Sequence, residues 1–407
     1  MATTTLATVD AVLKEIYEKR LRDQLQSDTI ALKRIESSSE GVTSEVGGKY
    51  VTFPIRTRRN HGIGARAENT VLPVAQSQKY AAARISLAYL YGAVEITGQT
   101  MELAQNNTQA FTSVLDAEMS GLRQTLAKDM NRQTYGTSAG ILATATGAGS
   151  TTTFVTTDAD AQYLEVGMIL DIWDTSAGAL MTGGPFEITT LVSAGGNTTV
   201  TYTGASGAAT ASGDTLHRVG SRNLETIGLR SIVSDTGTLY NIDPTVEPVW
   251  KSVNNSNSGT LRALSEGLMI KTADDVRKNG GKTTVILTTM GVRRAYFQLL
   301  VQQRRYTNTK EFAGGFSGLA FTTDWGEIPV VSDWDCQANR LYFLNEDELK
   351  VYREGEWAFM NRDGSNWQRK ITSAGNFDAY QAMMYSYRQL GTHRRNSHAL
   401  LGDITEA

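Results

Sequence analysis

The chain has one cysteine, Cys336, among its 407 residues. A single thiol cannot form an intramolecular disulfide or supply a multi-cysteine zinc site, so neither kind of cross-link holds this fold. Proline is also scarce, with 6 residues, which argues against long stiff linkers. No apolar run approaches the length of a membrane span, and no basic start followed by an apolar stretch marks a signal peptide. We therefore expect neither membrane insertion nor secretion.

An excess of charge of one sign is absent as well. The chain carries 39 basic and 42 acidic residues, for a formal net charge of -3. This balance excludes a broadly basic nucleic-acid-binding protein, although local basic patches are still allowed. The composition changes sharply in residues 137–220, which are rich in Thr and Gly and contain one basic residue, Arg218. Short β-rich runs between glycine clusters predict that this segment is a small all-β unit inserted into the chain.

Periodicity predicts the elements before this insert. Apolar residues in 9–35 recur every three or four positions, which indicates an amphipathic helix. Residues 48–91 alternate as two strands around an irregular tip at 60–76, so they indicate a long hairpin arm whose tip contains few apolar residues. A second helix, about 28 residues long, begins at the N-cap Asn107. Its predicted core side chains are Phe111, Leu115, Leu122, Leu126 and Met130.

Helices and strands are predicted to alternate after the insert. The helical patterns cover 261–278 and 292–303, and glycines at 280–281 end the first of them. Strand-like runs cover 284–287, 328–332, 340–344, 349–352 and 380–389, and a last short strand is expected near 398–404.

Motifs for catalysis or cofactor binding are incomplete. Gly281-Lys-Thr283 resembles the end of a phosphate-binding loop, but Val276 replaces its first glycine and a helix precedes it. The four histidines are scattered, and no metal-ligand spacing connects them. Asp333 and Asp335 could act as paired carboxylates, although a turn after a strand explains them more simply. We therefore predict no catalytic, cofactor or metal site, and Cys336 is expected to be an inert thiol.

The hairpin arm has the strongest local charge imbalance in the sequence. One acid, Glu68, accompanies seven basic residues there. The arm could dock on an acidic surface of another copy of the chain, or it could be a solvated charged loop. Nucleic acid is a third partner to consider, but the tip has no aromatic side chains for base stacking. The candidate contact residues are Lys49, Arg56, Arg58, Arg59, Arg66, Lys79 and Arg84.

The order of these parts resembles that of tailed-bacteriophage major capsid proteins. Residues 89–99, Tyr-Leu-Tyr-Gly-Ala-Val-Glu-Ile-Thr-Gly-Gln, are similar to the return strand of that family's extended loop, directly before its spine helix. Asn223-Leu-Glu-Thr-Ile-Gly-Leu-Arg-Ser-Ile-Val233 resembles the segment that follows the spine helix. Further similar segments are 284–296, 327–332 and 340–344, which resemble the axial domain, and 376–387 with 399–403, which resemble the returning strand pair.

The resemblance implies an α+β major capsid protein fold with an inserted all-β domain. Its expected parts are an N-terminal arm with an amphipathic helix (1–47), an extended hairpin loop (48–95), a peripheral domain with the spine helix (96–136), the inserted domain (137–220), the continued peripheral domain (221–250), the axial domain (251–369) and the peripheral C-terminal strands (370–407).

The resemblance also implies a function without catalysis. The expected protein self-assembles into the pentamers and hexamers of an icosahedral phage head enclosing double-stranded DNA, and it is assembled in the host cytoplasm. Expected partners are copies of itself, a separate scaffolding protein, a portal, a candidate decoration protein and DNA held by non-specific contacts, with no cofactor, metal or membrane. An encapsulin-type compartment is the alternative, and a soluble α/β enzyme with a β accessory domain is a distant one. A fibre protein is disfavoured because no repeat is present.

Some members of the resembled family cross-link a lysine of the extended loop to an asparagine of a neighbour. The tip at 60–76 contains Arg66 and no lysine, and a guanidinium cannot form that isopeptide bond. We predict that disassembled particles run as one band near 44.3 kDa on a denaturing gel. A ladder of covalent multimers would contradict this.

Overall fold

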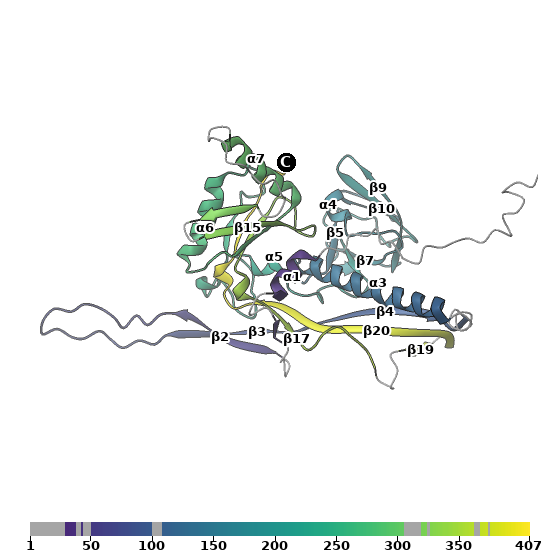
Figure 1. The fold of residues 1–407 in the computed structure, drawn as a ribbon, viewed down its shortest axis with the longest axis horizontal. Helices are drawn as coiled ribbons and strands as arrows, with labels where there is room; N and C mark the ends of the chain where they lie inside the picture. The colour runs from purple at the N-terminus through teal and green to yellow at the C-terminus, as the bar shows by residue number, and fades with distance from the viewer. Residues whose placement is uncertain are drawn as a thin grey trace, which may run out of the picture.

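The computed structural model describes residues 29–37, 42–43, 50–99, 108–304, 319–323, 326–361, 367–372 and 375–407. Figure 1 shows an elongated lower layer of strands, from which the hairpin arm extends at one end. Two bodies rise above this layer, and the long helix α3 (Thr108–Thr134) runs beneath the second of them. No helix in the described ranges is long and apolar enough to cross a membrane.

The lower layer is built on the long strand β20 (Gly375–Thr392), which pairs antiparallel with β4 (Ala88–Thr97) from Ala379 to Arg388. Successive side chains of β4 point to opposite faces of this sheet. Val94 and Ile96 of β4 are buried, whereas Tyr89 and Tyr91 point away and are exposed. The other strands of this sheet are β1 (Val42–Thr43), β17 (Leu349–Arg353), β18 (Ala358–Phe359) and β19 (Gln368–Thr372).

A second six-stranded sheet forms the first upper body, with the order β12-β21-β16-β13-β15-β14. Its central strands β13 (Val285–Thr288) and β16 (Leu341–Leu344) are buried at every position, as their continuous apolar runs require. The helices α6 (Glu266–Lys278) and α7 (Met290–Arg304) flank it. The remaining strands are β12 (Val253–Asn255), β14 (Ala320–Thr323), β15 (Gly326–Ser332) and β21 (Ala399–Leu401).

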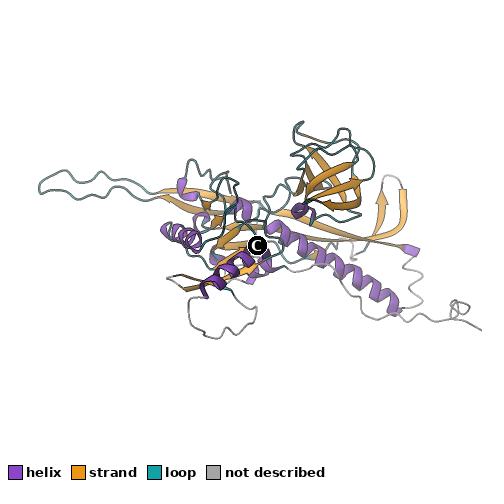
Figure 2. Cartoon of the chain, turned by 90° about the horizontal axis from the view of Figure 1, so that it is seen from above, coloured by secondary structure: helices purple, strands orange, loops and turns teal. Residues whose placement is uncertain are grey.

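The Thr- and Gly-rich segment folds as the second upper body around its own apolar cluster, which includes Phe154, Ile172 and Phe186. Figures 1 and 2 show it as a separate sheet beside α3. The helix α4 (Asp158–Ala161) closes one edge. Its strands are β5 (Ile141–Thr144), β6 (Thr153–Thr157), β7 (Ile169–Asp174), β8 (Ala179–Leu180), β9 (Phe186–Ala194), β10 (Asn197–Tyr202) and β11 (Thr215–Arg218).

The arm consists of β2 (Val51–Arg58) and β3 (Lys79–Ile85), joined by a tip without regular structure. Along β2, side chains alternate between half-buried and exposed, and Phe53 and Ile55 pack against the central core. This core also contains residues of α1 (Ile30–Ser37), α5 (Leu229–Ile232) and the short helix η2 (Pro248–Trp250). The base of the arm is therefore anchored by packing.

A buried arginine fixes the loops around this core. Arg395, in the short helix η4 (Arg395–Ser397), is 1% exposed, and its guanidinium donates only to backbone carbonyls. Together these bonds join the C-terminal region to the segment that carries α5 and η2. The accepting carbonyls belong to Ser231, Ile232, Thr236, Gly237 and Trp250.

Three differences from the sequence predictions have clear causes. The alternating run 83–91 is two strands, because the chain leaves the hairpin at Ile85 and continues as β4 beside β20, so the hairpin ends before the expected boundary at 95. The helix expected from residue 261 begins at Glu266, because Ser265 caps it through a bond from the Leu268 amide. β17, which was expected in the axial domain, lies in the sheet of β20, and β21, which was expected among the peripheral strands, lies in the sheet of β13. The order of strands along the chain does not reveal which of them pair.

Most other predicted elements are present. The helix from Asn107 is α3, and the later strands and α7 lie within a few residues of their expected ranges, although β20 is much longer than 380–389. Of the N-terminal helix expected over 9–35, α1 covers the C-terminal end, and residues 1–28 lie outside the described residues.

Gly228 gives a direct test of the packing between the end of α3 and the segment that follows the insert. A Cβ at Gly228 would lie 2.6 Å from the Gly136 amide nitrogen and would clash with the Gln133 carbonyl. We predict that Gly228→Ala lowers the free energy of unfolding by about 1–3 kcal/mol, measured by urea unfolding of the unassembled chain.

The matched control is Gly121→Ala in α3, where a Cβ meets nothing within 4 Å. This substitution should raise stability by up to about 1 kcal/mol through helix propensity. Equal stability of the two variants would show that Gly228 is not a close contact.

Candidate functional site: the basic arm and the buried charge junction

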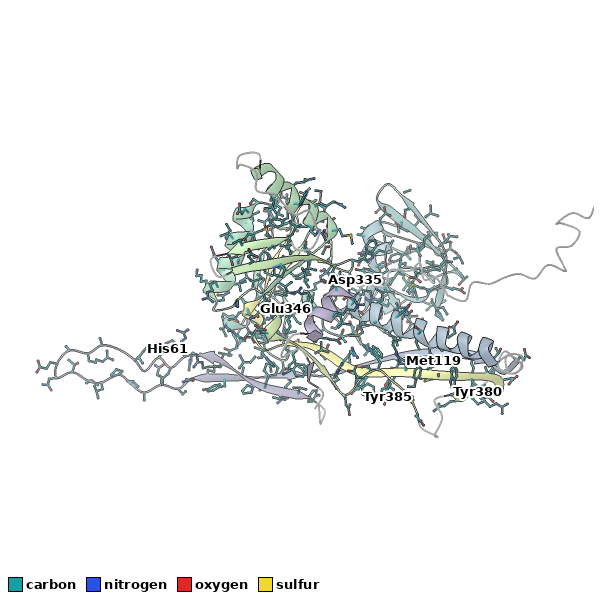
Figure 3. The ribbon with its side chains drawn as sticks, in the orientation of Figure 1. His61, Met119, Asp335, Glu346, Tyr380 and Tyr385 are labelled. Atoms are coloured by element: carbon teal, nitrogen blue, oxygen red, sulfur yellow. The ribbon has the colours of Figure 1, made fainter. Side chains whose placement is uncertain are left out.

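The exposed face of the arm carries its basic side chains. Arg56 lies opposite Tyr80 and Arg58 opposite Lys79, with a bulge between the two pairs, and Thr52 lies opposite Arg84. These side chains alternate with those that contact the core, so the charges gather on the face directed away from it. His61, at the start of the tip, points into solvent (Figure 3).

One predicted contact residue has a partner in its own chain. Lys79 forms an ion pair with Glu247, and this bond, assisted by Thr57 and by the charge of Arg58, lowers the pKa of Glu247. Arg56, Arg59, Arg66 and Arg84 are exposed, and no carboxylate in the described part of the chain forms an ion pair with them. Lys49 lies outside the described residues.

The surface of the tip contains more apolar side chains than we expected from the sequence. Four aliphatic side chains, Ile63, Val71, Leu72 and Val74, are 77–85% exposed. They follow no strand or helix period, so their pattern gave no signal of a common surface. The tip therefore leaves four large apolar side chains in contact with water.

The second candidate site is a junction of buried charges. Asp333 and Asp335 follow β15 in a turn, as predicted, and Asp333 accepts a 3.0 Å bond from the amide of Asp335. They are 2% and 0% exposed. Because a buried carboxylate needs compensating partners, the turn alone does not explain them.

The partners of these carboxylates come from three other parts of the chain. From α3, Asn131 donates to Asp335 at 2.6 Å and Lys128 lies 3.0 Å from it. The amide of Ala31, in the first turn of α1, donates to Asp333 at 2.8 Å. From the insert, the Tyr163 hydroxyl donates to the carbonyl of Asp335. Figure 3 places Asp335 where these parts meet.

Burial raises the pKa of Asp335, although the bonds from Asn131 and Lys128 oppose this shift. Asp335 in the folded state is therefore protonated at a higher pH than an exposed aspartate would be. The arrangement positions elements relative to each other and offers no substrate access, so its chemistry is structural. Sequence reasoning missed Lys128 and Asn131. Their spacing of three residues on a helix was the available signal.

A second charge network joins α3 to the C-terminal end of the insert and to the segment that follows it. Arg132 bonds to Asp129 at 3.0 Å and to Glu225, and Arg218 lies 3.2 Å from Asp129. Burial alone would raise the pKa of Asp129, but Arg132 and Arg218 outweigh it and lower the pKa to about 2. Burial raises the pKa of Glu225 against the attraction of Arg132. Arg218, the insert's one basic residue, thus contacts the helix beneath it.

The predicted core residues of the long helix are distributed along α3. Met130 is buried, and Leu122 and Leu126 are half-buried beside Gly92, where any larger side chain would collide with both leucines. The side chains of Phe111 and Leu115 lie outside the described residues. The expected assignment of these five to one core therefore stays a prediction.

No group of His, Cys, Asp and Glu within the described ranges could hold a metal ion. His217 and His398 are buried and hydrogen-bonded, and burial lowers the pKa of His398 to about 3. Cys336 is buried as a free thiol. These residues serve packing and hydrogen bonding in the fold.

The charge network predicts a measurable acid dependence. Because its folded-state pKa is lowered from 3.8 to about 2, Asp129 stabilises the fold above pH 3.8, and this contribution is lost as pH falls toward 2. We expect Asp129→Asn to lower the free energy of unfolding by about 2 kcal/mol at pH 7, measured by urea unfolding.

The deficit of Asp129→Asn should shrink as the pH approaches 2. Asp274→Asn, at an exposed position of α6, is the control and should match the parent. A deficit that does not change with pH would contradict the role of the Asp129 charge.

Comparison with known proteins identifies what this architecture is similar to. The structure of the cyanophage A-1(L) capsid asymmetric unit aligns with a TM-score of 0.60 and 16% identity, covering 99% of this chain and 100% of that chain. The capsid of a native GTA particle aligns with a TM-score of 0.51 and 10% identity, covering 99% and 100%. At these identities the likeness shows a shared fold. No curated protein matches the chain by sequence.

The model of the SU10 major capsid protein family matches residues 4–371, which is most of the chain. This match covers the arm, α3, the insert and every strand of the second sheet except β21, and it does not favour the encapsulin alternative. The chain belongs to the SU10 major capsid protein family and is a major capsid protein of the tailed-phage type.

Proposed function

We propose that this capsid protein forms the hexamers and pentamers of an icosahedral head around double-stranded DNA, and that the arm makes the contact between neighbouring copies. The observation that carries the proposal is the arm itself. It projects from the body (Figures 1 and 2), and its exposed face carries arginines without carboxylate partners in the described residues. Its base is packed into the core, so the arm presents these charges in a fixed direction.

A second copy is a better partner for the arm than solvent or nucleic acid. A loop that contacts only water would not need one face of its hairpin to pack against the core, as this one does. DNA binding would account for the arginines, but not for four exposed aliphatic side chains at the tip. An acidic and partly apolar protein surface suits both features, because rim charges guide the approach while apolar groups are removed from water.

The three larger sheets support the expected division of the chain. The sheet of β12, β13 and their neighbours corresponds to the proposed axial domain, the layer of β4 and β20 with α3 to the peripheral domain, and the third sheet to the insert. The insert has one basic residue against seven acids. We infer that it faces away from the packaged DNA, because like charges repel.

Non-specific phosphate contacts hold DNA inside, a separate scaffolding protein and a portal take part in assembly in the host cytoplasm, and the insert is the surface available to a decoration protein. Assembly requires no catalysis. The paired carboxylates that an enzyme would use, Asp333 and Asp335, are enclosed by Asn131 and Lys128.

Charge reversal on the arm tests the proposal. We expect the triple variant Arg56→Glu, Arg58→Glu and Arg59→Glu to remain a folded monomer but to form no particles, because all three side chains lie on the exposed side of the hairpin. Electron microscopy and size-exclusion chromatography measure the particles, and circular dichroism checks the fold.

The matched control replaces the same three residues by lysine, which keeps their charge and should allow assembly. Normal shells from the glutamate variant would refute the role of the arm's charges.

A further inference from the structure

A group of basic side chains lies at the C-terminal end of α6, where the chain turns through Gly280 and Gly281. Lys278 is in the last turn of the helix and Lys282 follows the turn, and both side chains are exposed. Arg394, 114 residues after Gly280, reaches the same place, because its guanidinium donates to the Gly280 carbonyl at 3.0 Å. These three cations, which come from two distant segments, form the α6 patch.

Few carboxylates neutralise the α6 patch. Glu348 lies 3.8 Å from Arg394, which is long for an ion pair, and 43% of the Arg394 side chain stays exposed. No carboxylate in the described part of the chain forms an ion pair with Lys278 or Lys282. Asp274, one helical turn before Lys278, is an exposed acid. The patch therefore keeps an excess of positive charge.

The C-terminal end of a helix attracts cations by itself, and this attraction explains only part of the patch. Arg277 and Lys278 lie in the last turn of α6, where they balance the partial negative charge of the last carbonyls. Lys282 lies beyond the helix, and the described residues supply no carboxylate to pair with it. Helix stability therefore does not explain Lys282.

The glycine turn of the patch resembles the end of a nucleotide-binding loop, but its amides are already used. The Gly280 amide donates to the Arg277 carbonyl at 2.8 Å, and the Gly281 amide donates to the Val276 carbonyl at 3.0 Å. These bonds end the helix. A nucleotide-binding loop needs such amides to surround the phosphates. The patch can therefore bind phosphate only through side-chain charge, without selecting a particular nucleotide.

The composition of the patch suits a phosphate backbone better than a protein surface. Between residues 271 and 289, all of which are described, no large apolar side chain is exposed. Protein interfaces are enriched in aromatic residues and depleted in lysine. Contacts to a nucleic-acid backbone need only cations, because these replace the counterions of the phosphates. The α6 patch thus differs from the arm, whose tip exposes four aliphatic side chains.

The α6 patch and the acidic insert are at different ends of the upper layer. In Figure 1, α6 is on the flank of the first upper body that is turned away from the insert. The insert carries one basic residue against seven acids, so a polyanion is repelled there and attracted at the patch. A closed shell repeats the patch in every copy, so weak contacts add up over many subunits.

We propose that the α6 patch binds the phosphate backbone of double-stranded DNA without regard to sequence, through Lys278, Lys282 and Arg394. The inference rests on the proposed function, in which the shell encloses DNA, and it names the surface that contacts this DNA. Each copy contributes few contacts, so the DNA is held loosely and the attraction falls as the salt concentration rises.

Fluorescence anisotropy of a labelled DNA duplex with the unassembled full-length chain tests the patch. We expect Lys278→Gln with Lys282→Gln to weaken binding about tenfold at about 0.1 M salt. The slope of log K against log salt should become shallower by up to about 2, since each phosphate contact contributes about 0.9. Both side chains are exposed, so the fold should be retained, which circular dichroism checks.

The matched control is Lys33→Gln with Arg123→Gln, which removes the same charge from exposed positions of α1 and α3. It should bind DNA like the parent chain. The arm is unchanged in both variants, so its arginines contribute equally. Equal weakening by the control, or an unchanged slope in the Lys278 and Lys282 variant, would overturn the inference.

A photoreactive phenylalanine analogue at position 282 tests the contact in particles. Irradiation of DNA-filled particles should join the chain to DNA, whereas the same analogue at position 180, on β8 of the insert, should not. Filled particles in which position 282 cross-links only to a neighbouring copy would overturn the inference and leave the capsid function standing. Parent particles without DNA, or no particles at all, would contradict the proposed function itself.

Discussion

The structure depends on the burial of two carboxylates, Asp333 and Asp335, at the point where four parts of the chain meet. Buried charges are costly, and the cost is offset only while Asn131, Lys128 and the Ala31 amide remain in place. Movement of α1 or α3 away from the turn would leave at least one carboxylate without partners. The junction therefore favours a single arrangement of these elements.

This arrangement matters because a closed shell multiplies small errors in orientation. In the proposed assembly, each copy must present its arm at an angle that closes a symmetric shell. The arm's direction is set by Phe53 and Ile55, which pack into the same core as residues of α1 and β17. The insert is joined to α3 by Arg218, which pairs with Asp129, and Asp129 is held in turn by Arg132. Packing and buried charge thus hold the arm, α3 and the insert in one arrangement within the chain.

The sequence predicted the parts better than their connections. Period-four apolar residues located α3, alternation located the arm, and the loss of basic residues located the insert, because each signal is local. The pairing of β4 with β20 and the capping of α1 by Asp333 join residues about three hundred positions apart. No periodicity encodes such contacts. The exposed aliphatic residues of the tip were missed for a different reason, since an irregular segment has no repeating pattern that shows which side chains gather.

The most direct test of the account is a high-resolution electron microscopy map of particles formed by this chain, expressed alone and with its neighbouring genes. The account predicts closed shells of uniform diameter in which every arm lies on an adjacent copy and the Asp333 junction is intact in each subunit. A stable monomer or dimer under every condition, or shells in which the arm contacts only its own copy, would contradict it.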